Sequence, residues 1–303
     1  MIAFKRILVP VDFSEASKKA ITYGLTLADQ FNSKLILAHI VPESSALAYA
    51  FPTETFDMEK EQVEKAQSAI KDLVPPEYAA RQHIQEIVRT GNIEAELLAI
   101  VQNEGADLVV MGTHGRRRLG RWFLGSVTEH MLRKVPVPVL TVSHVDTEKH
   151  QVGMVSLKRI LYATDLSEYS NAGLKYAVEI ARAAGSSLSV MHAIHYPDRR
   201  LWAAGGIPGL ESERAADVQE MRKRLADVLA QEAPQEMQVE MLVVEGRPSE
   251  KILEIAGERA MDIIVLNLQS KSTLERTLIG ITAERVVRLA PIPVLSVPPA
   301  GKR

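Results

Sequence analysis

The fold is decided by the stretch Lys5-Arg6-Ile7-Leu8-Val9-Pro10-Val11-Asp12, which returns 153 residues later as Lys158-Arg159-Ile160-Leu161 leading to Asp165. The two copies also close alike, because Pro136-Val137-Pro138-Val139-Leu140 returns as Pro291-Ile292-Pro293-Val294-Leu295. A chain of 303 residues would divide into two domains on length alone, at roughly 150 residues each. The repeat therefore predicts two similar domains, over residues 1–145 and 156–300, joined by a polar linker.

Each copy alternates apolar strand patterns with helical ones. In the first copy we expect strands at 6–11, 34–41, 86–89, 108–111 and 137–142, and helices at 15–31, 56–73, 93–103 and 127–134. The second copy repeats this order, with inner strands at 188–193, 239–244 and 263–266. Strands that alternate with helices form a parallel sheet with right-handed crossovers. The sequence thus predicts an α/β protein of two tandem Rossmann-like domains, each a five-stranded parallel open sheet with helices on both faces.

Composition narrows the class of protein. The chain is 46% hydrophobic and 24% charged, as is usual for a soluble globular protein, and its net charge of −2 provides no general attraction to nucleic acid or anionic lipid. It contains no cysteine, which excludes disulfides, thiolate zinc sites and a cysteine nucleophile. We see no signal-peptide pattern and no apolar run near the ~20 residues of a membrane helix. We therefore expect a cytoplasmic protein with no membrane or nucleic-acid partner.

A glycine frame follows the fourth expected strand of the first copy. Gly112-Thr113-His114-Gly115 is separated by nine residues from Gly125-Ser126. A backbone that wraps a phosphate brings its N–H groups close and often adopts positive φ, which glycine allows without steric cost. Ser126-Val127-Thr128-Glu129 matches a capping box with Ser126 as N-cap, and the free N–H groups of such a helix start attract an anion. The alternative is a tight turn in which Ser126 only caps.

The spacing Gly-x-x-Gly, nine residues, Gly-Ser is similar to the ATP-binding signature of the universal stress protein family. The opening Val9-Pro10-Val11-Asp12-Phe13-Ser14 and the Pro-Val-Pro-Val-Leu ending also resemble that family, nearly over the whole chain and twice, as in its tandem members. The resemblance implies five parallel strands per domain and a bound adenine nucleotide, ATP, with Mg²⁺ as an optional companion. It also implies that the domains pair through their last strands, 139–142 against 294–297, and that a homodimer could form.

Carried over by position, the resemblance places adenosine at the ends of the first two strands and the phosphates at the glycine frame. The adenosine side comprises Pro10, Val11, Asp12, Ile40 and Val41. The phosphate side comprises Met111, Gly112, His114, Gly115, Arg116, Gly125, Ser126, Val127 and Thr128. No residue is assigned as catalytic or as a metal ligand.

Several of these residues also have an ordinary structural interpretation. Asp12 could accept a hydrogen bond from a ribose hydroxyl, or it could accept hydrogen bonds within the turn before the first helix. Because it recurs as Asp165 in the second copy, we expect at least part of its role to be structural. His39 and His192 occupy matching positions, and we interpret them as structural histidines whose hydrogen bonds are made within the protein. Arg116 could clamp phosphate oxygens or belong to a solvated basic cluster.

The second copy departs from the glycine frame. Asn267 and Ser270 carry Cβ atoms where the first copy has glycine, and Ile281 replaces the hydroxyl of Ser126 with a branched apolar group. We therefore expect that the second copy does not hold a triphosphate in the same way.

The sequence as a whole predicts an ATP-binding stress-response protein that acts by ligand-dependent regulation through an unidentified protein partner. It is not expected to be an enzyme, because no general base is evident near the phosphate residues. Two alternatives stay open: an interaction scaffold that does not use nucleotide, and a slow ATPase.

Overall fold

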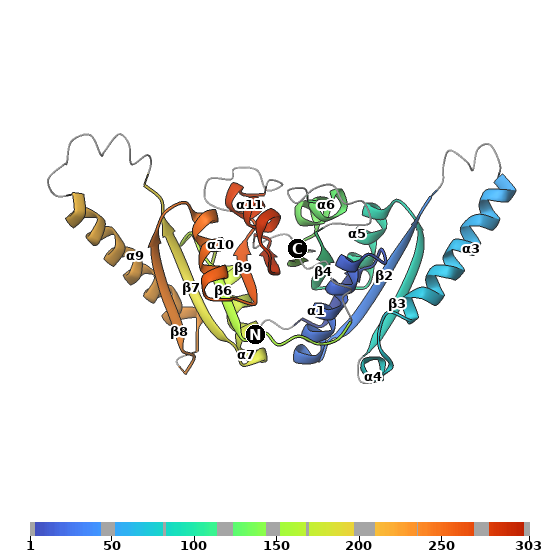
Figure 1. The fold of residues 1–303 in the computed structure, drawn as a ribbon, viewed down its shortest axis with the longest axis horizontal. Helices are drawn as coiled ribbons and strands as arrows, with labels where there is room; N and C mark the ends of the chain where they lie inside the picture. Colours follow the sequence, from blue (N-terminus) through green and yellow to red (C-terminus); the bar gives the residue numbers. More distant parts are fainter. Residues whose placement is uncertain are drawn as a thin grey trace. The chain divides into compact units, whose positions relative to one another are not determined.

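The computed structural model describes residues 4–43, 52–80, 83–113, 124–143, 152–167, 170–196, 210–234, 236–269 and 279–299. The chain divides into two compact units, Ala3–Ser156 and Leu157–Arg303, called here the first and second unit. Figure 1 shows that strands and helices alternate in each of them. No helix among the described residues is both long enough and apolar enough to span a membrane.

The first unit is a parallel sheet of five strands in the order β3-β2-β1-β4-β5. Its strands are β1 (Arg6–Pro10), β2 (Lys34–Pro42), β3 (Ile84–Gly91), β4 (Leu108–Gly112) and β5 (Val139–Val142). Its helices are α1 (Glu15–Phe31), α3 (Pro52–Lys71), α4 (Pro76–Ala79), α5 (Ile93–Asn103) and α6 (Ser126–Lys134). Right-handed crossovers place α1 and α3 on one face and α5 and α6, which contact each other, on the other.

The second unit repeats this topology as β8-β7-β6-β9-β10, again with every pair parallel. Its strands are β6 (Arg159–Ala163), β7 (Ser187–Ile194), β8 (Val239–Glu245), β9 (Ile263–Asn267) and β10 (Val294–Val297). Its helices are α7 (Asn171–Ala184), α9 (Leu210–Glu232), α10 (Pro248–Glu258) and α11 (Ile281–Leu289). The predicted pair of five-stranded α/β units is confirmed.

The strands are apolar runs because helices cover both faces of the sheet. Ile7, Leu8 and Val9 of β1 are fully buried, and so are Leu108, Val109 and Val110 of β4 beside it. Helix α1 begins where the sequence predicts, since the Ser14 side chain accepts from the Ser17 backbone N–H, and α5 is followed by Gly105 at φ +61°. Strand β3 is longer than predicted because it pairs with β2 from Ile84 to Gly91.

An aspartate clamps the start of the first strand in each unit. The Asp107 carboxylate accepts from the backbone N–H groups of Lys5 (2.8 Å) and Arg6 (3.1 Å). Asp262 does the same for Lys158 (2.7 Å) and Arg159 (2.8 Å). These bonds fix the register between the first and fourth strands of each unit.

The described part of the linker is anchored to the first unit. The Gly153 N–H donates to the Thr22 hydroxyl (3.4 Å) and the Val155 N–H to the Thr26 hydroxyl (3.0 Å), both on the buried side of α1. Residues 153–155 therefore lie along α1, although the sequence there shows no pattern.

Gly24 marks the tightest contact between α1 and the sheet. A Cβ at this position would come 2.7 Å from Val9 Cγ2 and 3.1 Å from Leu35 Cδ1. Alanine favours helices more than glycine by up to about 1 kcal/mol, but overpacking a core costs about 1–3 kcal/mol. We expect Gly24→Ala to lower the free energy of unfolding by about 1 kcal/mol, measured by equilibrium urea unfolding.

Two further variants serve as controls. Gly257 lies in α10 with nothing within 4 Å of an added Cβ, so Gly257→Ala should be neutral or stabilise by up to about 1 kcal/mol. In a double-mutant cycle, Val9→Ala should relieve the cost of Gly24→Ala, with a coupling of about 1 kcal/mol. Additive effects would show that the contact with Val9 is not the cause.

Candidate nucleotide site

The carboxyl ends of β1, β2 and β4 bring the predicted site residues to one edge of the first sheet. The strand order reverses between β1 and β4, and an open parallel sheet binds ligands at such a reversal. Val11 and Asp12 follow β1, Ile40 and Val41 end β2, and Met111 and Gly112 end β4. His114, Gly115 and Arg116 lie outside the described residues.

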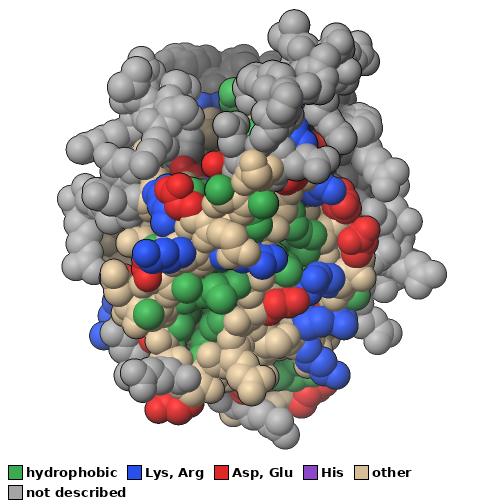
Figure 2. All heavy atoms as spheres, turned by 90° about the vertical axis from the view of Figure 1, so that its left-hand side faces the viewer, with side chains coloured by type: hydrophobic (Ala, Val, Ile, Leu, Met, Phe, Trp, Pro, Cys, Tyr) green, Lys and Arg blue, Asp and Glu red, His purple; other side chains and the backbone are tan. Residues whose placement is uncertain are grey.

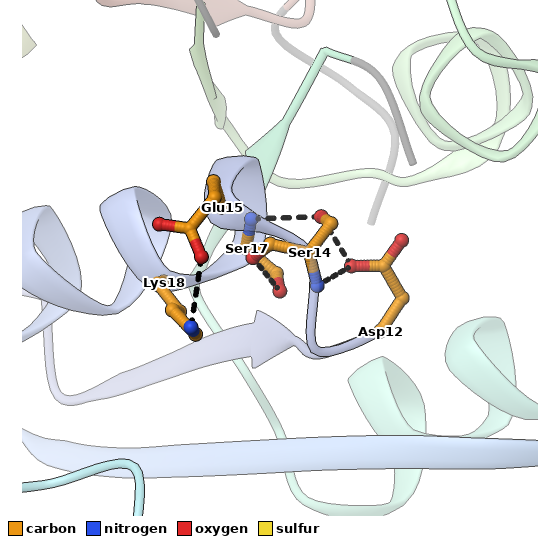
Figure 3. A network of polar contacts seen from close by, with 5 residues as sticks. All are labelled: Asp12, Ser14, Glu15, Ser17 and Lys18. Carbon is orange, nitrogen blue, oxygen red and sulfur yellow. Dashed lines mark hydrogen bonds and ion pairs between the residues drawn. The ribbon is translucent and has the colours of Figure 1, made fainter. Parts of the chain in front are cut away.

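The turn after β1 is built on Asp12 (Figure 3). Asp12 Oδ1 accepts from the Ser14 N–H (3.0 Å) and from the Ser14 hydroxyl (2.6 Å), and Phe13 between them has φ 64°. The second unit repeats this turn with Asp165, Ser167 and Leu166, at the same two distances and with φ 55°. Asp12 therefore has a structural role that both units share, while its contact with a ligand stays a prediction.

His39 supports the same turn from β2. Its Nδ1 lies 2.6 Å from the Val11 carbonyl oxygen, and its ring packs against the Phe13 ring at a centroid distance of 4.7 Å. Because a carbonyl only accepts, Nδ1 carries the proton. His192 makes the corresponding bond to the Thr164 carbonyl at 2.9 Å. The interpretation of both histidines as structural agrees with these contacts.

The end of β2 offers main chain rather than side chains to a ligand. Val11, Ile40 and Val41 are at most 5% exposed. Pairing of β2 with β1 ends at Pro10↔Ala38, whereas pairing with β3 continues to Pro42. Beyond Ala38, the main chain of β2 is therefore not paired with β1 in the sheet. A main-chain contact between this end of β2 and adenine requires such an unpaired edge.

Gly112 is needed for close approach rather than for an unusual backbone angle. A Cβ there would lie 2.7 Å from the Ala16 Cβ and 3.1 Å from its carbonyl carbon, in the first turn of α1. Gly112 is not among the described glycines with positive φ, and Gly125 has φ −60°. The expectation of a positive φ is thus wrong for Gly112, while Gly115, for which the sequence suggests the same, lies outside the described residues.

Helix α6 starts one residue earlier than the capping box predicts. Gly125 is the N-cap and has no side chain with which to cap the helix, while Ser126 is the first helical residue and is exposed. Glu129 pairs instead with Arg133, at 2.8 Å. The predicted capping box is therefore wrong, because the Gly125 N–H is fixed by the Thr113 carbonyl (2.8 Å) and the chain turns helical directly after it.

Thr128 holds the start of α6 against β4. Its buried hydroxyl donates to the Gly112 carbonyl at 2.9 Å, so this group is engaged within the protein. Within the described residues, nothing accepts from the backbone N–H groups of Ser126, Val127 and Thr128, and the first intrahelical bond runs from Glu129 to Gly125. The open N–H groups of a helix start thus lie beside the end of β4.

The second unit keeps the main chain of this site and changes its side chains. Gly280 caps α11 with φ −62° and ψ 144°, as Gly125 does with −60° and 144°. Ile281, in the place of Ser126, is 87% exposed, so its side chain extends into solvent and does not fill the helix start. Ala283 replaces Thr128, which removes the hydroxyl that ties the helix to the strand.

Asn267 stands in the place of Gly112, and a glycine in α7, Gly173, provides the room for its side chain. Its side chain occupies the space that a Cβ on Gly173 would need, and its Oδ1 lies 3.4 Å from the Tyr162 hydroxyl. Tyr162 donates to the Ser170 carbonyl, and burial raises the pKa of its phenol. A polar network thus fills the region between β9 and α7, where the first unit has Val9 and Gly112 in the places of Tyr162 and Asn267.

Among the described residues, no three His, Cys, Asp or Glu side chains are arranged to hold a metal ion. A parallel sheet that reverses its strand order beside an uncapped helix start defines a class of α/β domains suited to phosphate-bearing ligands.

The family follows from comparison with known proteins. The model of the universal stress protein family matches residues 3–143 and again 156–298, so the chain belongs to this family, as a tandem member. A universal stress protein of Mycolicibacterium smegmatis is 25% identical over 302 residues, covering 97% of both chains. One from Thermus aquaticus is 31% identical over 142 residues, covering 46% of this chain and 98% of that protein. A universal stress protein structure from Archaeoglobus fulgidus superposes with a TM-score of 0.68 at 20% identity, covering 99% of each chain, and shows the same fold.

The different roles of Ser126 and Thr128 can be tested by stability. Thr128→Val keeps the shape of the side chain but leaves the Gly112 carbonyl without its donor, which should cost about 1 kcal/mol of unfolding free energy. Ser126→Ala should change it by less than about 0.5 kcal/mol, because the side chain is exposed and caps nothing. Urea unfolding measures both. A loss of about 1 kcal/mol in Ser126→Ala would instead assign Ser126 a capping role.

Proposed function

We propose that the first unit binds ATP or a related adenine nucleotide at the carboxyl edge of its sheet. The observation that carries this proposal is the open start of α6, where the N–H groups of Ser126, Val127 and Thr128 have no partner among the described residues. A helix start carries about half a positive charge, which favours the phosphates of a nucleotide. The glycine spacing from Gly112 to Gly125 and membership of the family support the same ligand.

Each group of residues has a defined task in this proposal. Adenosine lies against Pro10, Val11 and Asp12 after β1, with main-chain groups of Ile40 and Val41 reading the adenine edge. The phosphate groups lie between two sets of residues, one at the end of β4 and one at the start of α6. These are Met111, Gly112, His114, Gly115 and Arg116, followed by Gly125, Ser126, Val127 and Thr128. The hydroxyl of Ser126 faces solvent at the helix start and is available to the ligand, whereas that of Thr128 is committed to Gly112.

We propose a regulatory rather than a catalytic use of the nucleotide in the stress response. The site supplies donors for phosphate, and the Asp12 carboxylate is engaged with Ser14 at the adenosine end. Mg²⁺ would be held by the phosphates and water, because the site offers no cluster of acidic ligands among the described residues. A nucleotide can act as a switch only if it binds two states of the protein with different affinity. Three further points stay predictions: the pairing of residues 139–142 with 294–297, a homodimer, and a protein partner.

Ligand binding should be visible as stabilisation. ATP at a hundred times its dissociation constant should raise the unfolding free energy of the first unit by about 2.7 kcal/mol, which a thermal-shift measurement detects as several degrees. Absence of a shift at millimolar ATP would favour the nucleotide-independent scaffold. Phosphate release above background from the bound complex would favour the slow ATPase.

Exchange of residues between the two units locates the site. Ser126→Ile places the residue of the second unit at the start of α6 and should weaken ATP binding about tenfold, or ~1.4 kcal/mol, in isothermal titration calorimetry. Ile281→Ser is the matched control and should leave the affinity unchanged. Gly115→Val should abolish binding, because a branched side chain would block the approach of phosphate. Equal affinities for Ser126→Ile and the unaltered protein would refute a contact between the ligand and the Ser126 hydroxyl, and retained binding in Gly115→Val would refute the assignment of phosphate to the glycine frame.

A further inference from the structure

A cavity lies at the edge of the first sheet where the strands begin, opposite the candidate nucleotide site. Its volume is about 600 Å³, and it is lined by Lys5, Arg6, Asn32, Lys34, His83 and Ile84. Arg6 and Lys34 are the first residues of β1 and β2, and His83 directly precedes β3. The candidate nucleotide site lies at the other ends of these strands, so the two locations are distinct.

Three basic residues form a row across the strand starts. Arg6 is the register partner of Lys34, and the next pair, Leu35↔Ile84, places His83 beside Lys34. The Leu35 N–H donates to the His83 carbonyl at 2.8 Å, which fixes this neighbour. Residues directly opposite in neighbouring strands project to the same face of the sheet, and like charges placed there repel each other. Arg6 and Lys34 therefore carry like charges side by side in the row of Arg6, Lys34 and His83, called here the basic row, and an anion that lies against the row would offset their repulsion.

The described residues neutralise few of the charges that line this cavity. In the described part of the chain, Lys5, Lys34 and His83 take part in no salt bridge. Arg6 is close enough to Asp107 to favour its charged form, but the Asp107 oxygens already accept the Lys5 and Arg6 backbone N–H groups and burial raises its pKa. The carbonyl end of α1 adds only about half a negative charge beside Asn32.

The second unit shows that the basic row is not required for folding. It keeps the aspartate clamp on Lys158 and Arg159, but the register places Ser187 opposite Arg159. The pair Leu188↔Val239 places Gln238 beside Ser187. The same topology therefore forms with Arg159, Ser187 and Gln238 in the row, and the two extra basic side chains of the first unit have no counterpart there.

We propose that this cavity binds a small polyanion, a molecule with two or more linked phosphate groups. Lysine and arginine side chains hold phosphate oxygens by charge-assisted hydrogen bonds, and Asn32 and the His83 ring can add polar contacts. The volume of about 600 Å³ is that of a small-molecule site. A long nucleic acid fits less well, because the chain has a net charge of −2. Figure 2 shows the face of the second unit that carries α9, where Lys and Arg side chains lie among Asp, Glu and hydrophobic side chains.

The test uses inorganic tripolyphosphate as probe and the intact protein in isothermal titration calorimetry. We expect binding that weakens at least tenfold in Lys34→Ser/His83→Gln, which carries the row of the second unit. Binding should persist in Ser126→Ile, the variant of the nucleotide site. The reciprocal variant Ser187→Lys/Gln238→His should gain a binding site. Failure of ATP binding at α6 would leave these outcomes unaffected, because they are read at the other edge of the sheet.

Three results would overturn the proposal. They are no binding at low ionic strength, equal affinity for the double variant and the unaltered protein, or loss of binding in Ser126→Ile alone. Tighter binding of a double-stranded oligonucleotide, lost in the same double variant, would replace the small polyanion by nucleic acid. Unchanged thermal unfolding of Lys34→Ser/His83→Gln establishes that it is folded. Should it unfold, Lys5→Gln, which alters one exposed side chain of the cavity, provides the same comparison.

Discussion

The close approach of Gly112 to Ala16 is the constraint on which the candidate nucleotide site depends. Because no side chain separates them, the end of β4 reaches the first turn of α1. The hydroxyl of Thr128 then holds α6 to the same residue through the Gly112 carbonyl. Strand β4, the first turn of α1 and the start of α6 thus meet at one glycine, and the turn of Asp12 directly precedes that first turn of α1. Any side chain at this position would force the helix and the strand apart.

The second unit shows how the same backbone can be maintained without that glycine. Asn267 introduces a side chain at the end of β9, and Gly173 in α7 provides the room for it. Tyr162 adds a buried hydroxyl that bonds the Ser170 carbonyl. The helix start keeps its backbone angles at Gly280, so the two units differ in the groups they present to a ligand rather than in the path of the chain. The edge where the strands begin has diverged in a similar way, since the basic row of the first unit is partly neutral in the second.

Much of the fold could be predicted from the sequence, because strand and helix patterns are local. Helices α1 and α5 have the predicted bounds, and their caps at Ser14 and Asn92 are formed by residues within three positions. The parts that could not be predicted depend on residues distant in sequence. The role of Gly112 requires Ala16, the start of α6 depends on a bond from Gly125 to Thr113, and the anchoring of residues 153–155 requires Thr22 and Thr26. The basic row was missed because it appears only when the register of three strands is known.

The aspartate clamps have a consequence for how the chain reaches its native state. Asp107 and Asp262 each bind a segment that begins Lys-Arg-Ile-Leu, and the two segments are identical over these four residues. In an unfolded chain, either segment can satisfy either carboxylate with the same hydrogen bonds. Exchange of whole strands between similar units is a characteristic misfolding route of repeat-containing proteins. We therefore expect correct assembly to be favoured when the N-terminal unit completes its sheet before the second copy of the segment leaves the ribosome, and refolding of the whole chain from denaturant to be more open to this exchange.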